Sequence, residues 1–162
     1  MKILDSTVLI AILKEIKCIS LIDSILKLNH QLVITQSVYA ELLDGYTEVE
    51  CKKLMKIKKI QLINLNSPKE IEQLKKTYPG LGDGEIDSLL SYQKLVKQEK
   101  SIYCILDDAT ARKKAKKLGI NYTGFLGLLK LLKKRKILSD KDYSDIIKKL
   151  RNSNFRLPKD IC

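Results

Sequence analysis

The stretch YCILDDATARK, residues 103–113, decides how this chain is expected to fold. Its apolar run ends at two adjacent carboxylates, Asp107 and Asp108, and a lysine-rich segment of helical character follows. The N-terminal KILDST, residues 2–7, repeats the arrangement with Asp5 at the end of its apolar run. Short apolar runs bounded in this way are typical of buried parallel strands. The two stretches therefore predict two strands that carry acidic side chains at their carboxyl ends.

Strand-length apolar runs alternate with segments of helical period along the whole chain. Strands are expected at residues 2–5, 31–35, 60–65, 101–106 and 120–123. Helices are expected at residues 7–15, 38–46, 67–76, 85–96, 108–118, 127–136 and 139–152. This alternation, with strands that are apolar throughout, predicts an α/β three-layer sandwich with a central, mostly parallel five-stranded sheet. No linker or repeat divides the sequence, so residues 1–162 are expected to form a single domain.

Local signals indicate where two of these helices begin and end. Ser67, Pro68 and Glu70 occupy the N-cap, the first and the third position of a capping box. Gly119 stands where the helix over residues 108–118 is expected to stop.

Composition narrows the classes of function. The 31 Lys+Arg residues outnumber the 19 Asp+Glu residues and give a formal net charge of +12. Such an excess favours a polyanionic partner, because lysines that neutralise phosphates gain affinity by releasing counterions. Solvated, lysine-rich helix faces explain the charge equally well. His30 is the sole histidine, and its place in an expected turn disfavours both zinc chemistry and a serine triad.

The cysteine pattern and the hydropathy indicate where the protein resides. Four cysteines stand at positions 18, 51, 104 and 162 without a C-x-x-C pair, so reduced thiols are expected, with Cys104 in the core. No apolar run reaches the ~20 residues that a membrane span needs. Asp5 interrupts the N-terminal apolar segment, and no small-residue cleavage site follows. We therefore expect a soluble, cytoplasmic protein with no membrane partner.

Acidic residues from separate segments are candidates for one site. In an open parallel sheet the ligand crevice lies beyond the carboxyl ends of the strands, where Asp5 and Asp107 are expected. Glu41 borders the apolar stripe of the second expected helix. Glu85 lies at the edge of the apolar face of its helix, whereas Asp87 falls on the opposite side and is expected to be solvated.

Simpler roles explain each acid taken alone. Asp5 and Asp108 are suited to N-cap the helices that follow them. Asp83, Glu85 and Asp87 suit the positive end of a helix dipole. Carboxylates that converge in one crevice, however, repel each other and require a counter-charge. An all-oxygen site selects a hard cation, Mg²⁺ or Mn²⁺, which activates water and stabilises an in-line phosphoryl displacement, so the acids together favour a nuclease.

Four segments resemble, in order and spacing, a stand-alone prokaryotic PIN-domain protein: ILDSTVLI, VYAELL, GLGDGEIDSLL and CILDDATARKKAKKLGINYTGFLGLLKLLKKRKIL. The resemblance extends over nearly the whole chain, including the C-terminal FRLPKDIC. Its most specific part is the Asp-Asp-x-x-Ala-Arg helix that leads to TGFLGLL. The resemblance implies a PIN-like fold and a metal-dependent endoribonuclease, often the toxin of a toxin–antitoxin pair. RNA, a cognate antitoxin and a second copy of the chain are the partners it implies.

The resemblance also implies which acids form the site. The family's acidic positions fall on Asp5, Glu41 and Glu85 as catalytic residues, with Asp5 and Glu85 also expected to ligate Mg²⁺ or Mn²⁺. The last acid falls on Asp107 or Asp108, and the sequence leaves open which of the two ligates the metal; the strand end favours Asp107 as the catalytic one.

Polar and basic neighbours of these acids are candidates for the substrate side of the site. Ser6 or Thr7 matches the family's hydroxyl beside the first aspartate, which is expected to orient a carboxylate or a water. Arg112 and Lys113 follow the last acids by about one helical turn, which favours contact with a substrate phosphate; for Lys113 a solvated face is the simpler interpretation.

Two other functions fit parts of this pattern. One is a non-catalytic RNA-binding or regulatory protein that keeps the PIN-like fold. The other is a phosphoryl-transfer enzyme with an aspartate nucleophile, which requires a second aspartate two residues further on; Thr7 stands there instead.

Overall fold

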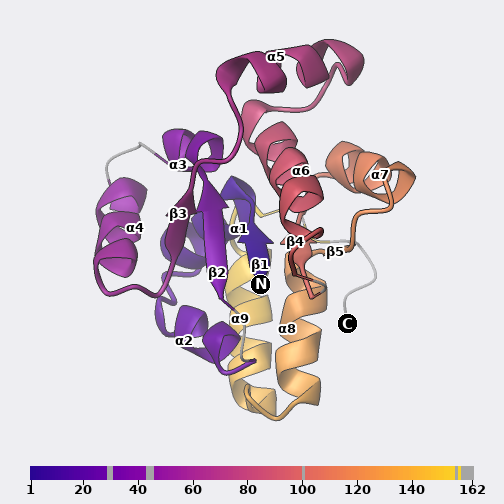
Figure 1. Cartoon of the computed structure of the whole chain (residues 1–162). Helices are drawn as coiled ribbons and strands as arrows, with labels where there is room; N and C mark the ends of the chain where they lie inside the picture. Colours follow the sequence, from indigo (N-terminus) through magenta and orange to yellow (C-terminus); the bar gives the residue numbers. More distant parts are fainter. Residues whose placement is uncertain (29–30, 43–45, 100, 156, 158–162) are drawn as a thin grey trace.

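The computed structural model describes residues 1–28, 31–42, 46–99, 101–155 and 157. His30, Cys162 and most of the FRLPKDIC segment lie outside this part, so the expectations for them are untested. Helices and strands follow in this order (Figure 1): β1 Lys2–Leu4, α1 Ser6–Ile10, the π-helical η1 Ala11–Glu15, α2 Ser20–Leu26, β2 Leu32–Thr35, α3 Gln36–Glu41, α4 Tyr46–Lys56, β3 Gln61–Ile63, α5 Pro68–Thr77, α6 Asp83–Leu95, β4 Tyr103–Ile105, α7 Ala109–Lys117, β5 Tyr122–Thr123, α8 Phe125–Lys134 and α9 Asp140–Arg151.

The strands form one five-stranded sheet in the order β3-β2-β1-β4-β5, and every pair is parallel. The expected α/β architecture is therefore confirmed. β1 is the central strand and pairs directly with β4, with Leu4 opposite Ile105. The two strands that end in acidic residues are thus neighbours in the middle of the sheet.

Alternate residues of the central strands supply the two halves of the core. Leu4 and Ile105 pack with side chains of α1, η1, α2, α8 and α9 on one face of the sheet. Ile3 and Cys104 point the other way and pack with side chains of α6 and α7. This division is the three-layer sandwich that the apolar strands predict. Cys104 is fully buried, and Cys18 and Cys51 are likewise free thiols.

The edge strand β3 departs from the expected pattern. Its residues are exposed or half-buried, and Leu62 is 39% exposed. An edge strand has a neighbour on one side only, so helices leave its outer part uncovered.

Helix ends follow the local signals. Ser67 and Glu70 form the reciprocal capping box of α5, with Pro68 at its first turn. Gly119 has a φ of 66°, the left-handed conformation that lets the chain leave α7. The helices α2 and α4 were not anticipated from the sequence. No helix in the described part of the chain is long and apolar enough to cross a membrane.

Candidate active site

The strand order brings the first two acids together. Asp5 directly follows β1, and its backbone N–H donates to the carbonyl of Ile105 at 3.2 Å. Asp107 lies two residues beyond Ile105, past the end of β4. Both therefore lie at the carboxyl edge of the central strand pair, the place where open parallel sheets bind ligands.

Asp5 is 1% exposed and lies near the carboxylates of Glu85 and Glu41. We call these three residues the acidic cluster. Burial, followed by the carboxylates of Glu85 and Glu41, raises the pKa of Asp5 to about 7, while hydrogen bonds from the Thr7 hydroxyl and the Ser6 backbone act in the opposite direction. The Oδ2 atom is buried and has no hydrogen-bond partner in the described part of the chain. This oxygen lacks the donor that buried carboxylates normally have.

Glu41 reaches the cluster from the last turn of α3. The Ser6 hydroxyl donates to its Oε2 at 2.5 Å, and the Gly84 backbone N–H donates to its Oε1 at 2.9 Å. A Cβ on Gly84 would stand 2.7 Å from Oε1, so a side chain at this position would displace the carboxylate from where it lies. Thr35 caps α3 by accepting from Val38 N–H, which fixes the direction of the helix. The start of α1, the end of α3 and the start of α6 meet at this carboxylate.

Glu85 occupies the first turn of α6 and turns back toward the helix start. Its Oε2 accepts a short hydrogen bond from the Gly82 N–H. Burial raises the pKa of Glu85, the Gly82 N–H opposes the shift, and the carboxylates of Asp108 and Glu41 add to it. Glu85 thus interacts electrostatically with Glu41 at the end of α3 and with Asp108 at the start of α7.

The adjacent aspartates Asp107 and Asp108 differ in environment. Asp107 is half-buried, and both its oxygens lie 3.2 Å from the Phe125 N–H at the start of α8. Burial raises the pKa of Asp107, and the Phe125 N–H and the Arg112 guanidinium oppose the shift. Asp108 is exposed and caps α7 by accepting from Ala111 N–H at 2.8 Å. The capping interpretation thus describes the observed contact of Asp108, whereas Asp107 accepts from the N-terminus of α8.

Two expected substrate contacts occupy different places. Arg112 is half-buried, and its guanidinium lies beside Asp107. A Cβ added to Gly124 would stand 3.0 Å from Asp107 Oδ1 and 3.2 Å from Arg112 Nη1, so both groups lie close to Gly124. Lys113 lies on the exposed outer side of α7, where it lines a shallow hollow with neighbouring lysines. The structure brings Arg112 to the acids and leaves Lys113 on the surface.

Asp87 corrects the sequence-based expectation of a solvated acid. It is 3% exposed, and its Oδ2 accepts from the Ser37 N–H at 3.0 Å while its Oδ1 accepts from Asn66 Nδ2 at 2.7 Å. The expectation fails because α6 packs against α5 as well as against the sheet, so its second side is also covered.

The donor atoms of the site suit a divalent cation. The donors are carboxylate oxygens, the type that Mg²⁺ and Mn²⁺ prefer. Asp5 Oδ2 is buried without a donor, as expected of an oxygen suited to a cation. No group of three or more histidine, cysteine, aspartate or glutamate side chains in the described ranges is arranged to hold a metal as it stands. Ser6 and backbone N–H groups instead donate hydrogen bonds to Glu41, Glu85 and Asp107.

Several groups that shape the site are backbone atoms. The N–H groups of Gly82, Gly84 and Phe125 bind the carboxylates, and Gly124 makes room for Asp107. The sequence signal for them is the glycine spacing in GLGDGE and TGF, which accompanies the expected helix starts.

A parallel α/β sandwich with acidic side chains at the carboxyl ends of its central strands belongs to the α/β proteins that bind their ligands at this edge of the sheet. The chain matches the DUF3368 family model, described as a PIN domain, over residues 1–162, and so belongs to the PIN-domain family. PIN domains are generally nucleases and act on nucleic acids. No curated protein and no solved structure matches the chain.

Proposed function

We propose that the protein is a Mg²⁺- or Mn²⁺-dependent endoribonuclease that hydrolyses RNA phosphodiester bonds. The observation that carries the proposal is the proximity of Asp5, Glu41 and Glu85, since the carboxylates of Glu85 and Glu41 add to the effect of burial in raising the pKa of Asp5. Asp107 lies at the end of the adjacent strand. Family membership supports nuclease activity in general.

Asp5 Oδ2, buried and without a donor, is the first oxygen that would ligate the cation. Glu85 and Asp107 would join it after exchanging their bonds to the Gly82 and Phe125 N–H groups. A bound Mg²⁺ or Mn²⁺ would neutralise the carboxylates and activate a water for attack on phosphorus.

The neighbouring side chains would position the other participants. Glu41, which accepts hydrogen bonds from Ser6 and Gly84, would accept a proton from the attacking water. Arg112 would bind a non-bridging phosphate oxygen, since its guanidinium already lies at the rim beside Asp107.

RNA cleavage tests the proposal. Purified protein should cleave a fluorescent single-stranded RNA with Mn²⁺ and not with EDTA, and Asp5→Asn should reduce cleavage at least a hundredfold. The matched control is Asp145→Asn, an exposed aspartate on α9 outside the site, which should leave the rate unchanged. Metal-dependent cleavage that survives Asp5→Asn counts against the assignment of the site.

A non-catalytic RNA-binding protein is the second candidate. It is favoured by the absence, in the described part of the chain, of three side chains already arranged around a metal. Under this alternative, the protein should bind RNA equally well with Mn²⁺ and with EDTA, and it should cleave none of several unrelated RNA substrates.

A role as the toxin of a toxin–antitoxin pair, a cognate antitoxin, a homodimer and a cytoplasmic location remain proposals that follow from the resemblance. Exposed apolar side chains support a protein partner: Val49 and Ile57 are 50% and 58% exposed, and Leu62 and Leu65 are 39% and 40% exposed. Co-purification of a small protein encoded by a neighbouring gene would support the antitoxin. Sedimentation that shows only monomers at micromolar concentration would contradict the homodimer.

A further inference from the structure

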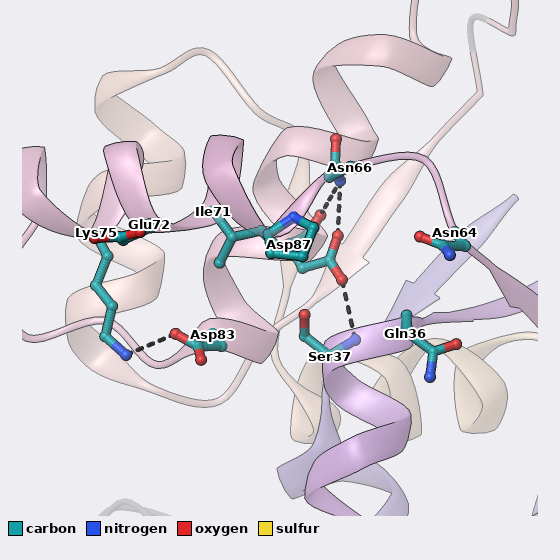
Figure 2. A pocket seen from close by; sticks show the side chains of 10 residues that line it. Gln36, Ser37, Asn64, Asn66, Ile71, Glu72, Lys75, Asp83 and Asp87 are labelled. Carbon is teal, nitrogen blue, oxygen red and sulfur yellow. Dashed lines mark hydrogen bonds and ion pairs between the residues drawn. The ribbon is translucent and has the colours of Figure 1, made fainter.

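A cavity of about 330 Å³ lies between α5, the start of α3 and the start of α6. Figure 2 shows its lining: Gln36, Ser37, Asn64, Asn66, Asp83 and Asp87, with Pro68, Ile71, Glu72 and Lys75 of α5. Asp83 and Asp87 are four residues apart and share one side of α6, while Glu85 lies two positions from each and interacts with Asp5 and Glu41. The cavity and the acidic cluster therefore lie on different sides of α6.

The floor of the cavity is polar, buried and fixed. Asp87 accepts hydrogen bonds from Ser37 N–H and Asn66 Nδ2, and Asn66 Nδ2 also lies 2.9 Å from Ser91 Oγ. Asn66 is 7% exposed and Asp87 is 3% exposed. Figure 2 shows these bonds tying α3, α6 and the loop before α5 to one another. Such a network holds the cavity in shape without a ligand.

The walls offer hydrogen-bonding groups that the protein itself does not use. The amides of Gln36 and Asn64 and the hydroxyl of Ser37 make no hydrogen bond within the described ranges. In Figure 2 the Ser37 hydroxyl points into the space between Asp83 and Asp87. Ile71 adds an apolar surface from α5. A volume near 330 Å³ with one apolar wall and several polar side chains in its lining is large enough for a small planar molecule.

The charge of the lining disfavours a phosphate. Glu72, Asp83 and Asp87 face one cation, Lys75, which is already bonded to Asp83 at 2.7 Å. A phosphate would meet surplus negative charge here, whereas a neutral group with N–H donors would find carboxylate and amide oxygens. Amide side chains and carboxylates are the groups that pair with the edges of nucleobases, and a carboxylate accepts from an exocyclic amino group.

We propose that this cavity binds one nucleobase of single-stranded RNA and selects a base that carries an exocyclic amino group over uracil. The inference rests on the proposed ribonuclease function, because the bound base and the phosphate at the acidic cluster would belong to the same RNA strand. α3 carries Gln36 and Ser37 at one end and Glu41 at the other, and α6 carries Asp83 and Glu85 in its first turn. An RNA strand that crosses α3 and α6 would therefore contact the cavity and the acidic cluster together.

Cytosine and uracil give the sharpest comparison, because cytosine carries an amino group at the ring position where uracil carries a carbonyl. Oligocytidylate and oligouridylate of equal length would be titrated by fluorescence anisotropy against the full chain carrying Asp5→Asn, which prevents cleavage. We expect oligocytidylate to bind about tenfold more tightly. The double change Gln36→Ala and Asn64→Ala should bring the two affinities within about twofold of each other.

The matched control is Gln73→Ala, which removes an exposed amide from α5 outside the cavity and should keep the discrimination. Equal affinities before mutation, no binding of either RNA, or discrimination that survives the double change would each overturn the inference. The proposed function is judged separately by Mn²⁺-dependent cleavage in the unmutated chain. Cleavage without base discrimination defeats the cavity assignment alone, and discrimination without cleavage defeats the nuclease proposal alone.

Discussion

At the residue scale, Asp5 combines two features that rarely occur together without a function. It is 1% exposed, and its Oδ2 has no donor in the described part of the chain. A buried carboxylate without full compensation destabilises the folded state, so the folded chain bears a cost at this position. Residues that cost stability in this way are commonly found at functional sites.

This cost predicts a dependence of stability on pH in the metal-free protein. The pKa of Asp5 rises from 3.8 to about 7 on folding, chiefly through burial and the Glu85 carboxylate. The folded state therefore holds the extra proton between these values, and the contribution of Asp5 to stability falls as pH rises through this range. Asp5→Asn should raise the free energy of unfolding by about 1–3 kcal/mol at pH 8 and leave it nearly unchanged at pH 4.

Urea denaturation at both pH values measures this difference, with Asp145→Asn as the control variant. Because other groups also titrate in this range, the informative quantity is the difference between variant and unmutated protein. A variant that is equally stabilised at both pH values, or destabilised at pH 8, would contradict the electrostatic account of Asp5.

Ser6 is expected to act by positioning Glu41. Its hydroxyl donates to Glu41 Oε2, a hydrogen bond to a charged acceptor. Ser6→Ala should lower RNA cleavage about tenfold, because the carboxylate loses one of its two donors. Ser6→Thr, which keeps a hydroxyl, should restore most of the rate. A purely structural role would instead lower the melting temperature in both variants without this difference in cleavage.

At the element scale, α6 carries Glu85 of the acidic cluster and also Asp83 and Asp87 of the cavity lining. Gly84 allows α6 to lie close to Glu41 of α3. Gly84→Ala should favour the helix by up to about 1 kcal/mol, yet its Cβ would stand 2.7 Å from Glu41 Oε1. We expect cleavage to fall at least tenfold with little change in melting temperature. The control Gln93→Ala, on the exposed side of α6, should leave cleavage intact. Unchanged cleavage by Gly84→Ala would show that Glu41 is not needed where it stands.

The sequence predicts the central strands well because they are buried on both faces. The apolar runs before Asp5 and Asp107 predict both central strands, because strands covered on both faces leave a continuous apolar signal. Asp87 is misplaced because helical periodicity assumes a single buried side, whereas α5 covers the second side of α6. The helix α4 was missed because its own apolar pattern is weak. Packing against η1 stabilises it instead.

The proximity of the candidate acids was predictable from the sequence, whereas their hydrogen-bond partners were not. Strand-end positions and the family resemblance led to the carboxylates, but the sequence does not show that Gly82, Gly84 and Phe125 N–H groups hold them. Those bonds depend on how α3, α6 and α8 approach one another, which is set by tertiary packing.

At the scale of the whole molecule, the net charge of +12 predicts binding of RNA that weakens steeply with salt. If Lys113 contacts a phosphate, Lys113→Gln should reduce the slope of log K against log salt concentration by about 0.7. The control Lys69→Gln, an exposed lysine on α5 outside the cavity lining, should leave the slope unchanged. Equal slopes for Lys113→Gln and the unmutated protein would place Lys113 on a solvated face.

A divalent cation held among the gathered carboxylates is the claim on which the nuclease proposal depends. The most direct measurement is the anomalous density of Mn²⁺ soaked into crystals of the full chain. We predict a peak within coordination distance of Asp5 Oδ2, with Glu85 or Asp107 turned away from its backbone N–H partner to complete the contact. Crystals that bind Mn²⁺ only elsewhere, or that show no peak at millimolar Mn²⁺ with Asp5 unchanged, would contradict the account.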